Sequence, residues 1–124
     1  MNNIDETKLL RVIKNKIHVN VNYFRKIVVA KNYDIIIECF VKINYDVLKK
    51  YDNFNYYISV ESIQMSDLMY YDFFEKLVQT VQTTFTTGFG KIYLTDTSII
   101  FYNIFPLIKI FIDKEILNNK LIIS

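Results

Sequence analysis

The sequence predicts an α+β fold, in which an antiparallel sheet of five or six strands packs against two helices at about residues 4–17 and 66–85. Apolar residues recur at helical spacing in these two segments and alternate with polar residues in several others. The chain is 52% hydrophobic and 23% charged, which is typical of a compact protein. At 124 residues without a Pro/Gly/Ser-rich linker, we expect one domain spanning 1–124.

The first predicted helix begins at the segment NIDE, where Asn3 can act as the N-cap and Glu6 follows three residues later, as in a capping box. Leu9 and Ile13 fall on one side of this helix and Lys8 on another. The pattern predicts an amphipathic helix lying across the sheet.

The next segments change to a period of two and predict strands at 19–23 and 35–43, joined by a turn between Lys31 and Asp34. A third strand is predicted over the segment NYYISVESI, which begins at Asn55. The intervening residues 45–54 are interpreted as a helical turn or loop.

The clearest helical pattern covers 66–85, with Ser66 as the N-cap. The apolar residues predicted to face the core from this helix are Phe74, Leu77, Val78, Val81 and Phe85.

Gly88 and Gly90 follow this helix and precede a strand. Phosphate-binding loops have the opposite order, with the glycines between a strand and the start of a helix. We therefore interpret the pair as structural, in the left-handed conformation common after a helix. A hairpin is then expected over 91–105, turning at Asp96 and Thr97, and residues 107–124 fit either a strand plus a short helix or a closing hairpin.

No catalytic, metal-binding or cofactor-binding motif is visible. His18 and Cys39 are the single residues of their kinds, too few for a structural zinc site, and Cys39 is interpreted as a small core residue. Asp72 and Glu75 lie on the polar face of the predicted helix beside Lys76. An enzyme would require an active site assembled from distant segments.

Positive charge is concentrated in segment 8–31, where seven Lys or Arg residues occur without an acidic residue. This segment could follow a phosphate backbone, with neighbouring aromatic rings stacking on bases. The candidate nucleic-acid contacts are Lys14, Lys16, Arg25 and Lys26.

Aromatic residues gather in the segment around residues 45–57. Large rings surrounded by charge are typical of protein-binding hot spots, although core packing would explain them equally well. The candidate partner-binding residues are Tyr51, Phe54, Tyr57, Asp52, Lys49 and Lys50.

The first functional hypothesis is a non-enzymatic protein-binding module, such as an immunity, antitoxin or anti-defence inhibitor encoded by a virus or mobile element, that blocks a partner's functional surface. A small nucleic-acid-binding protein is the alternative. We expect no cofactor, no metal and no membrane association, and a homodimer is compatible with the sequence. The N-terminal segment lacks the features of an export signal and Cys39 has no disulfide partner, so a cytoplasmic location is expected, in the host if the protein is viral.

Overall fold

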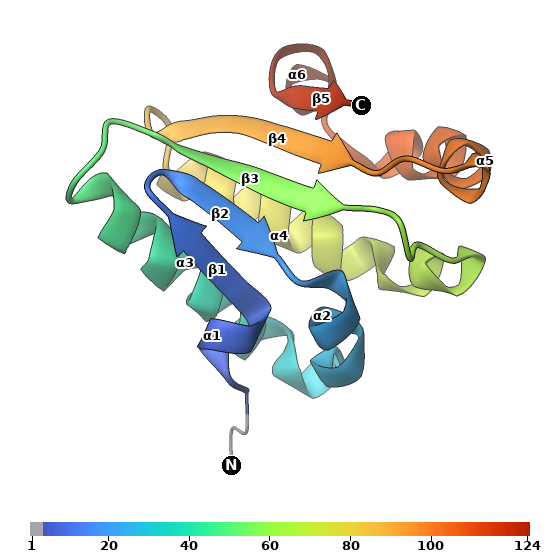
Figure 1. Cartoon of the computed structure of the whole chain (residues 1–124), viewed down its shortest axis with the longest axis horizontal. Helices are drawn as coiled ribbons and strands as arrows, with labels where there is room; N and C mark the ends of the chain where they lie inside the picture. The colour runs from blue at the N-terminus through green and yellow to red at the C-terminus, as the bar shows by residue number, and fades with distance from the viewer. Residues whose placement is uncertain (1–3) are drawn as a thin grey trace.

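The computed structural model describes residues 4–124 and combines helices with a five-stranded sheet (Figure 1). The α-helices are α1 (Glu6–Leu9), α2 (Val21–Ile27), α3 (Tyr33–Leu48), α4 (Tyr71–Thr84), α5 (Ile99–Ile108) and α6 (Lys114–Asn119). The strands are β1 (Leu10–Ile13), β2 (Lys16–Val19), β3 (Phe54–Ser59), β4 (Phe89–Thr95) and β5 (Leu121–Ile123). Short 3₁₀ helices lie at η1 (Ala30–Asn32), η2 (Met65–Tyr70) and η3 (Lys109–Phe111).

The expected combination of helices and sheet is confirmed, but the antiparallel arrangement is wrong. The strand order is β1-β2-β3-β4-β5, and only β1 and β2 pair antiparallel. The pairs β2–β3, β3–β4 and β4–β5 are parallel. Parallel neighbours need a crossover connection, and the chain supplies a helical segment between each pair.

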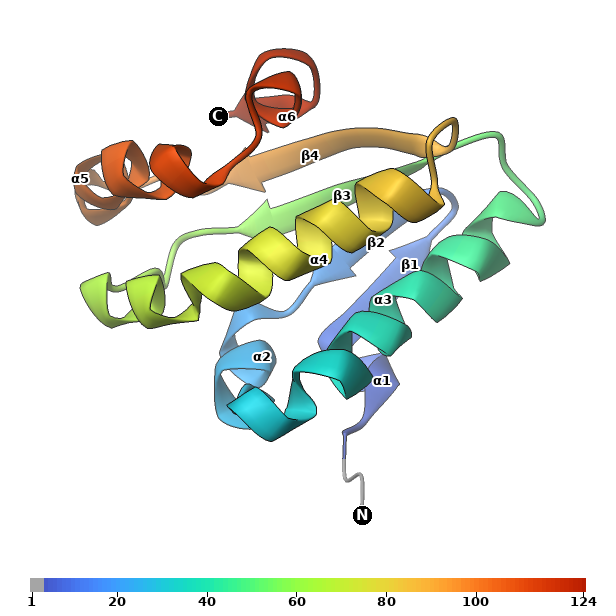
Figure 2. The ribbon, with the colours of Figure 1, turned by 180° about the vertical axis from the view of Figure 1, so that it is seen from behind.

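The helices cover one face of the sheet. From β2 to β5, each strand lies beside the preceding one in the same direction across the sheet. Because crossovers between parallel strands share the same right-handedness, the connecting helices lie on the same side. Figure 2 shows α3 and α4 in front of the strands, whereas Figure 1, from the opposite side, shows no helix in front of β1 to β4. One face of a mostly parallel sheet is therefore open.

The predicted helix 4–17 is wrong beyond its first turn. Asp5 caps α1 by accepting a hydrogen bond from the Thr7 N–H, and the predicted cap, Asn3, lies outside the described residues. The chain then forms the β1–β2 hairpin, which turns where Lys14 adopts a left-handed backbone with φ 56°. The apolar residues of this segment fit helical spacing as well as the period of two that is typical of strands. Pairing of β2 with β3 stabilises the strands.

The strands predicted at 19–23 and 35–43 are also wrong, because most of these residues lie in α2 and α3. Apolar residues fill so much of α3 that they fit period two as well as helical spacing. Its buried residues include Ile36, Phe40 and Val47, which recur at helical intervals. Packing of this face against the sheet outweighs the strand preference of the β-branched residues.

The helix predicted at 66–85 is present as η2 followed by α4, although Gln64 rather than Ser66 caps η2. Its predicted orientation needs correction at the N-terminal end, where Phe73 is fully buried and Phe74 is 44% exposed. Val81 and Phe85 are buried, as predicted.

Neither glycine has a positive φ, so the predicted left-handed conformation is wrong. Gly90 instead permits close approach of two strands, because a Cβ at this position would clash with the Asn55 side chain and lie 2.8 Å from the Phe54 carbonyl oxygen. The Asn55 side chain accepts a hydrogen bond from the Lys91 N–H at 2.7 Å, where the β3–β4 register shifts.

The second half of the predicted hairpin 91–105 is helix α5, whose N-cap Ser98 accepts a hydrogen bond from the Phe101 N–H. Residues 107–124 contain the end of α5, then η3, α6 and β5, so a short helix and a strand are present in the order helix then strand. The alternative closing hairpin is wrong, because β5 pairs parallel with β4. Within residues 4–124, no helix has the length and apolar character needed to cross a membrane.

Candidate functional site

An apolar cleft lies between α4 and α5 on the helical side of the sheet. Its volume is about 520 Å³, and its walls include Leu77 and Val78 of α4 and Phe101 and Phe105 of α5. Protein interiors rarely leave apolar voids of this size, whereas ligand and partner sites commonly have such volumes.

Exposed apolar side chains also occur on the elements that line this cleft. Ile99 is 82% exposed and Ile110 is 75% exposed, and no charged residue occurs between Asp96 and Lys109. The other large apolar residues exposed on η2, α4 and α5 are Met65, Met69, Tyr71, Phe74, Ile100, Tyr102 and Leu107. Large exposed apolar patches on proteins are typical of interaction sites.

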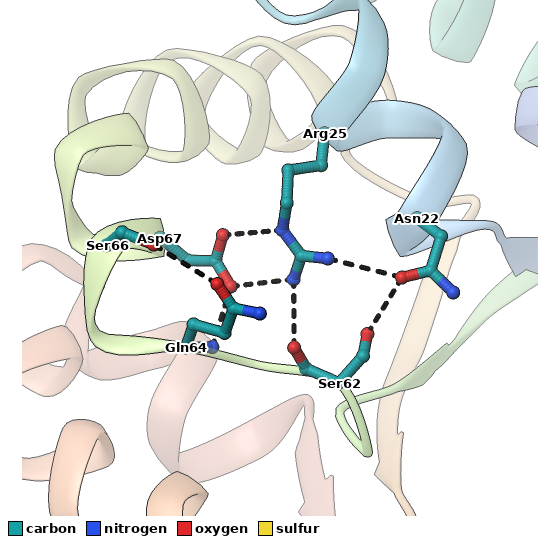
Figure 3. A network of polar contacts seen from close by, with 6 residues as sticks. All are labelled: Asn22, Arg25, Ser62, Gln64, Ser66 and Asp67. Carbon is teal, nitrogen blue, oxygen red and sulfur yellow. Dashed lines mark hydrogen bonds and ion pairs between the residues drawn. The ribbon is translucent and has the colours of Figure 1, made fainter.

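A polar cluster beside the cleft connects α2 by hydrogen bonds to η2 and to the connection between β3 and η2 (Figure 3). The Arg25 guanidinium donates to both carboxylate oxygens of Asp67, at 2.9 and 2.8 Å, and to the Ser62 carbonyl oxygen at 3.1 Å. It also donates to Asn22 Oδ1, which accepts a further hydrogen bond from the Ser62 hydroxyl. The bidentate hydrogen bonds to Asp67 raise the pKa of Arg25. Burial opposes ionisation of Asp67, but hydrogen bonds from Arg25 and the Gln64 N–H hold the pKa of Asp67 below its ordinary value.

The open face of the sheet carries a row of stacked rings. His18, Tyr57 and Tyr93 occupy facing positions on β2, β3 and β4. The ring centroids of His18 and Tyr57 are 5.2 Å apart and those of Tyr57 and Tyr93 are 4.6 Å apart, with interplanar angles of 27° and 13°. Lys16 Nζ lies 5.5 Å from the Tyr57 ring centroid. All three residues are half-buried, and the row joins three strands that are distant in sequence.

The residues predicted to bind a protein partner do not form one exposed cluster. Phe54 is fully buried in the core, which contradicts its expected exposure, because it faces the helices and packs against Phe85 and Phe89. Tyr57 lies on the opposite, open face of the same strand. The remaining predicted residues, all exposed in the connection from α3 to β3, are Lys49, Lys50, Tyr51 and Asp52.

The residues predicted to bind nucleic acid are also divided. Lys14 is exposed in the hairpin turn, Lys16 lies beside the ring row and Lys26 is exposed on α2. Arg25 is held by Asp67, so its guanidinium is not free to bind phosphate.

Sequence reasoning missed both the apolar surface of α5 and the ring row. Ser98 before an apolar run is an N-cap signal that could have revealed α5. The ring row depends on the pairing of β2, β3 and β4, which has no local signal.

Cys39 is buried, as interpreted from the sequence, but it lies on α3. Burial, reinforced by the nearby Glu6 carboxylate, raises the pKa of this thiol to about 11, so the reactive thiolate is scarce at neutral pH. Among residues 4–124, no three His, Cys, Asp or Glu side chains group in a way that could hold a metal ion.

Comparison of this chain with family models, with curated proteins and with solved structures finds no match.

Proposed function

We propose that this protein is a non-enzymatic binding module that engages another protein through the apolar surface formed by η2, α5 and the α4–α5 cleft. The observation that carries this proposal is the exposure of successive large apolar residues, Ile99 and Ile100, in a stretch free of charge between Asp96 and Lys109. Covering such side chains removes apolar area from water at about 25 cal/mol per Å².

The cleft indicates the chemistry of the partner. Apolar side chains of a partner would fill the empty volume of the cleft, and the atoms that line it would gain packing contacts that they otherwise lack. Among the charged residues lining the cleft, Arg25 and Asp67 neutralise each other, whereas Glu75 and Asp113 leave two carboxylates at its walls. A segment with large apolar side chains and a flanking Lys or Arg complements both features.

The more specific hypothesis of an inhibitor from a virus or mobile element is retained within this proposal, and its support is the amino-acid composition and small size of the chain. A cytoplasmic site of action is likewise proposed, supported by the buried free thiol of Cys39. Tyr51 and its charged neighbours Lys49, Lys50 and Asp52 remain a proposed secondary contact, without Phe54.

The test is affinity capture from the native cell or its host with nuclease treatment, followed by reconstitution with the purified partner. The variant is Ile99→Glu, and the control is Thr87→Glu, which adds the same charge to an exposed turn at the other end of β4. We expect Ile99→Glu to weaken partner binding at least tenfold without lowering thermal stability, and Thr87→Glu to bind normally.

Equal binding by wild type and Ile99→Glu would contradict the assigned surface. A concentration-dependent dimer by light scattering, lost in Ile99→Glu, would instead make a second copy of the chain the occupant and contradict a different protein partner.

A further inference from the structure

The open sheet face continues into a basic hollow at the carboxyl end of β2. The hollow has a volume of about 800 Å³, and three cationic residues, Lys8, Arg11 and Lys26, contribute to its wall. The remaining residues that line it are Thr7, His18, Val19, Asn20, Asn22 and Tyr23. No carboxylate is among these residues, so the hollow favours an anion.

His18 connects the hollow to the ring row, because it lines the first and stacks in the second. Arg11 faces His18 across the β1–β2 pair, and Ile122 faces Tyr93 across the β4–β5 pair. Because neither neighbour is aromatic, His18 and Tyr93 are the two outer rings of the row. Five strands at about 4.8 Å spacing give the face a width on the order of 20 Å.

The open face favours a polar, ring-containing polyanion over an apolar partner. Lys16 and Lys91 add positive charge to this face, although the Lys91 ammonium also donates to the Asn119 carbonyl oxygen. Asp96, at the carboxyl end of β4, accepts a hydrogen bond from the Ser59 hydroxyl at 2.7 Å; because β2, β3 and β4 are parallel, this acid lies at the same edge of the sheet as the hollow, on the second strand from β2.

Parallel sheets usually have both faces covered by helices, so an open face that carries aromatic rings and cationic side chains requires an explanation. We propose that this face binds single-stranded RNA, with phosphates in the hollow of Lys8, Arg11 and Lys26 and bases against the row of His18, Tyr57 and Tyr93. Aromatic side chains hold unpaired bases by stacking, and lysine and arginine follow the backbone. The tyrosine hydroxyls and Asn20 offer partners for the ribose 2′-OH, which favours RNA over DNA.

The RNA site is separate from the apolar surface of α5, so the two proposals fail independently. The Ile99→Glu variant leaves every residue of the RNA site in place and should bind RNA as the wild type does. Loss of partner binding with retained RNA binding would therefore separate the two functions.

The test measures fluorescence anisotropy of a labelled ten-nucleotide oligo(U) RNA at several salt concentrations, with oligo(dT) as the DNA arm. We expect a micromolar dissociation constant at low salt, rising at least tenfold in Tyr57→Leu and in the Arg11→Gln/Lys26→Gln double variant. The double variant should also reduce the slope of log affinity against log salt by about 0.7 for each cation that contacts a phosphate.

Lys109→Gln/Lys114→Gln is the matched control for charge, because both lysines are exposed between α5 and β5, and β5 is at the opposite edge of the sheet from β1. It should keep wild-type affinity. Absence of RNA binding at 50 mM salt, or equal losses in Lys109→Gln/Lys114→Gln and in Arg11→Gln/Lys26→Gln, would overturn the proposal. Equal affinity for oligo(dT) would overturn the assignment to RNA.

A second measurement keeps the proposal testable if Tyr57→Leu fails to fold. Ultraviolet crosslinking of a 4-thiouridine RNA to the wild-type protein should modify peptides containing His18, Tyr57 or Tyr93. Crosslinks confined to α5 and η2 would contradict the assigned face.

Discussion

Tyr56 and Asn44 form a polar pair inside the core. Tyr56 Oη donates to Asn44 Oδ1 at 2.7 Å, and both residues are buried. Burial raises the pKa of Tyr56, although the hydrogen bond with Asn44 acts in the opposite direction. Asn44 Nδ2 has no hydrogen-bond partner within the described part of the chain.

Replacing Tyr56 with Phe would therefore leave both polar ends of the Asn44 amide unsatisfied, and we expect Tyr56→Phe to lower the free energy of unfolding by about 1 to 3 kcal/mol in urea titrations.

The control is the double variant Tyr56→Phe/Asn44→Leu. Replacing both partners with apolar groups removes the unsatisfied amide, so the double variant should be more stable than Tyr56→Phe alone. If the two substitutions destabilised the protein additively, the pair would not be coupled in the way that the hydrogen bond implies.

At the scale of elements, the sequence predicts features that depend on local signals. The η2–α4 helical segment and strand β3 were predicted because their apolar spacing is unambiguous. The strand predicted at 35–43 failed because a segment such as IIIECFVKI, within α3, satisfies both periods. Parallel pairing was not predictable, since β2 and β3 meet only after an intervening helix that the sequence pattern did not reveal.

The β1–β2 hairpin replaces a predicted helix, and glycine substitutions distinguish the two structures. Lys14 has φ 56°, which strains a residue with a Cβ, whereas Lys16 begins strand β2. We expect Lys14→Gly to stabilise the protein by up to about 1 kcal/mol and Lys16→Gly to destabilise it by about 0.5 to 1 kcal/mol, measured by thermal or urea unfolding. Similar losses in both variants would support a helix through 4–17 and contradict the hairpin.

At the scale of the whole molecule, the strand order determines where function can reside. Helices collect on one face, and they leave a cleft between α4 and α5 and an open sheet opposite. The sequence could indicate Lys16, Lys26 and Tyr57 as binding residues by their chemistry. It could not place Tyr57 beside His18 and Tyr93, because that row forms only when three distant strands pair.

The central claim is that one face of this sheet is open to solvent, and the most direct test is paramagnetic relaxation of ring protons by an inert, soluble gadolinium chelate in NMR spectra. We predict strong relaxation of the Tyr57 and Tyr93 rings and protection of Tyr56 and Phe54, which face the helices. Protection of Tyr57 and Tyr93 equal to that of Tyr56 would show that this face is covered and would contradict the account.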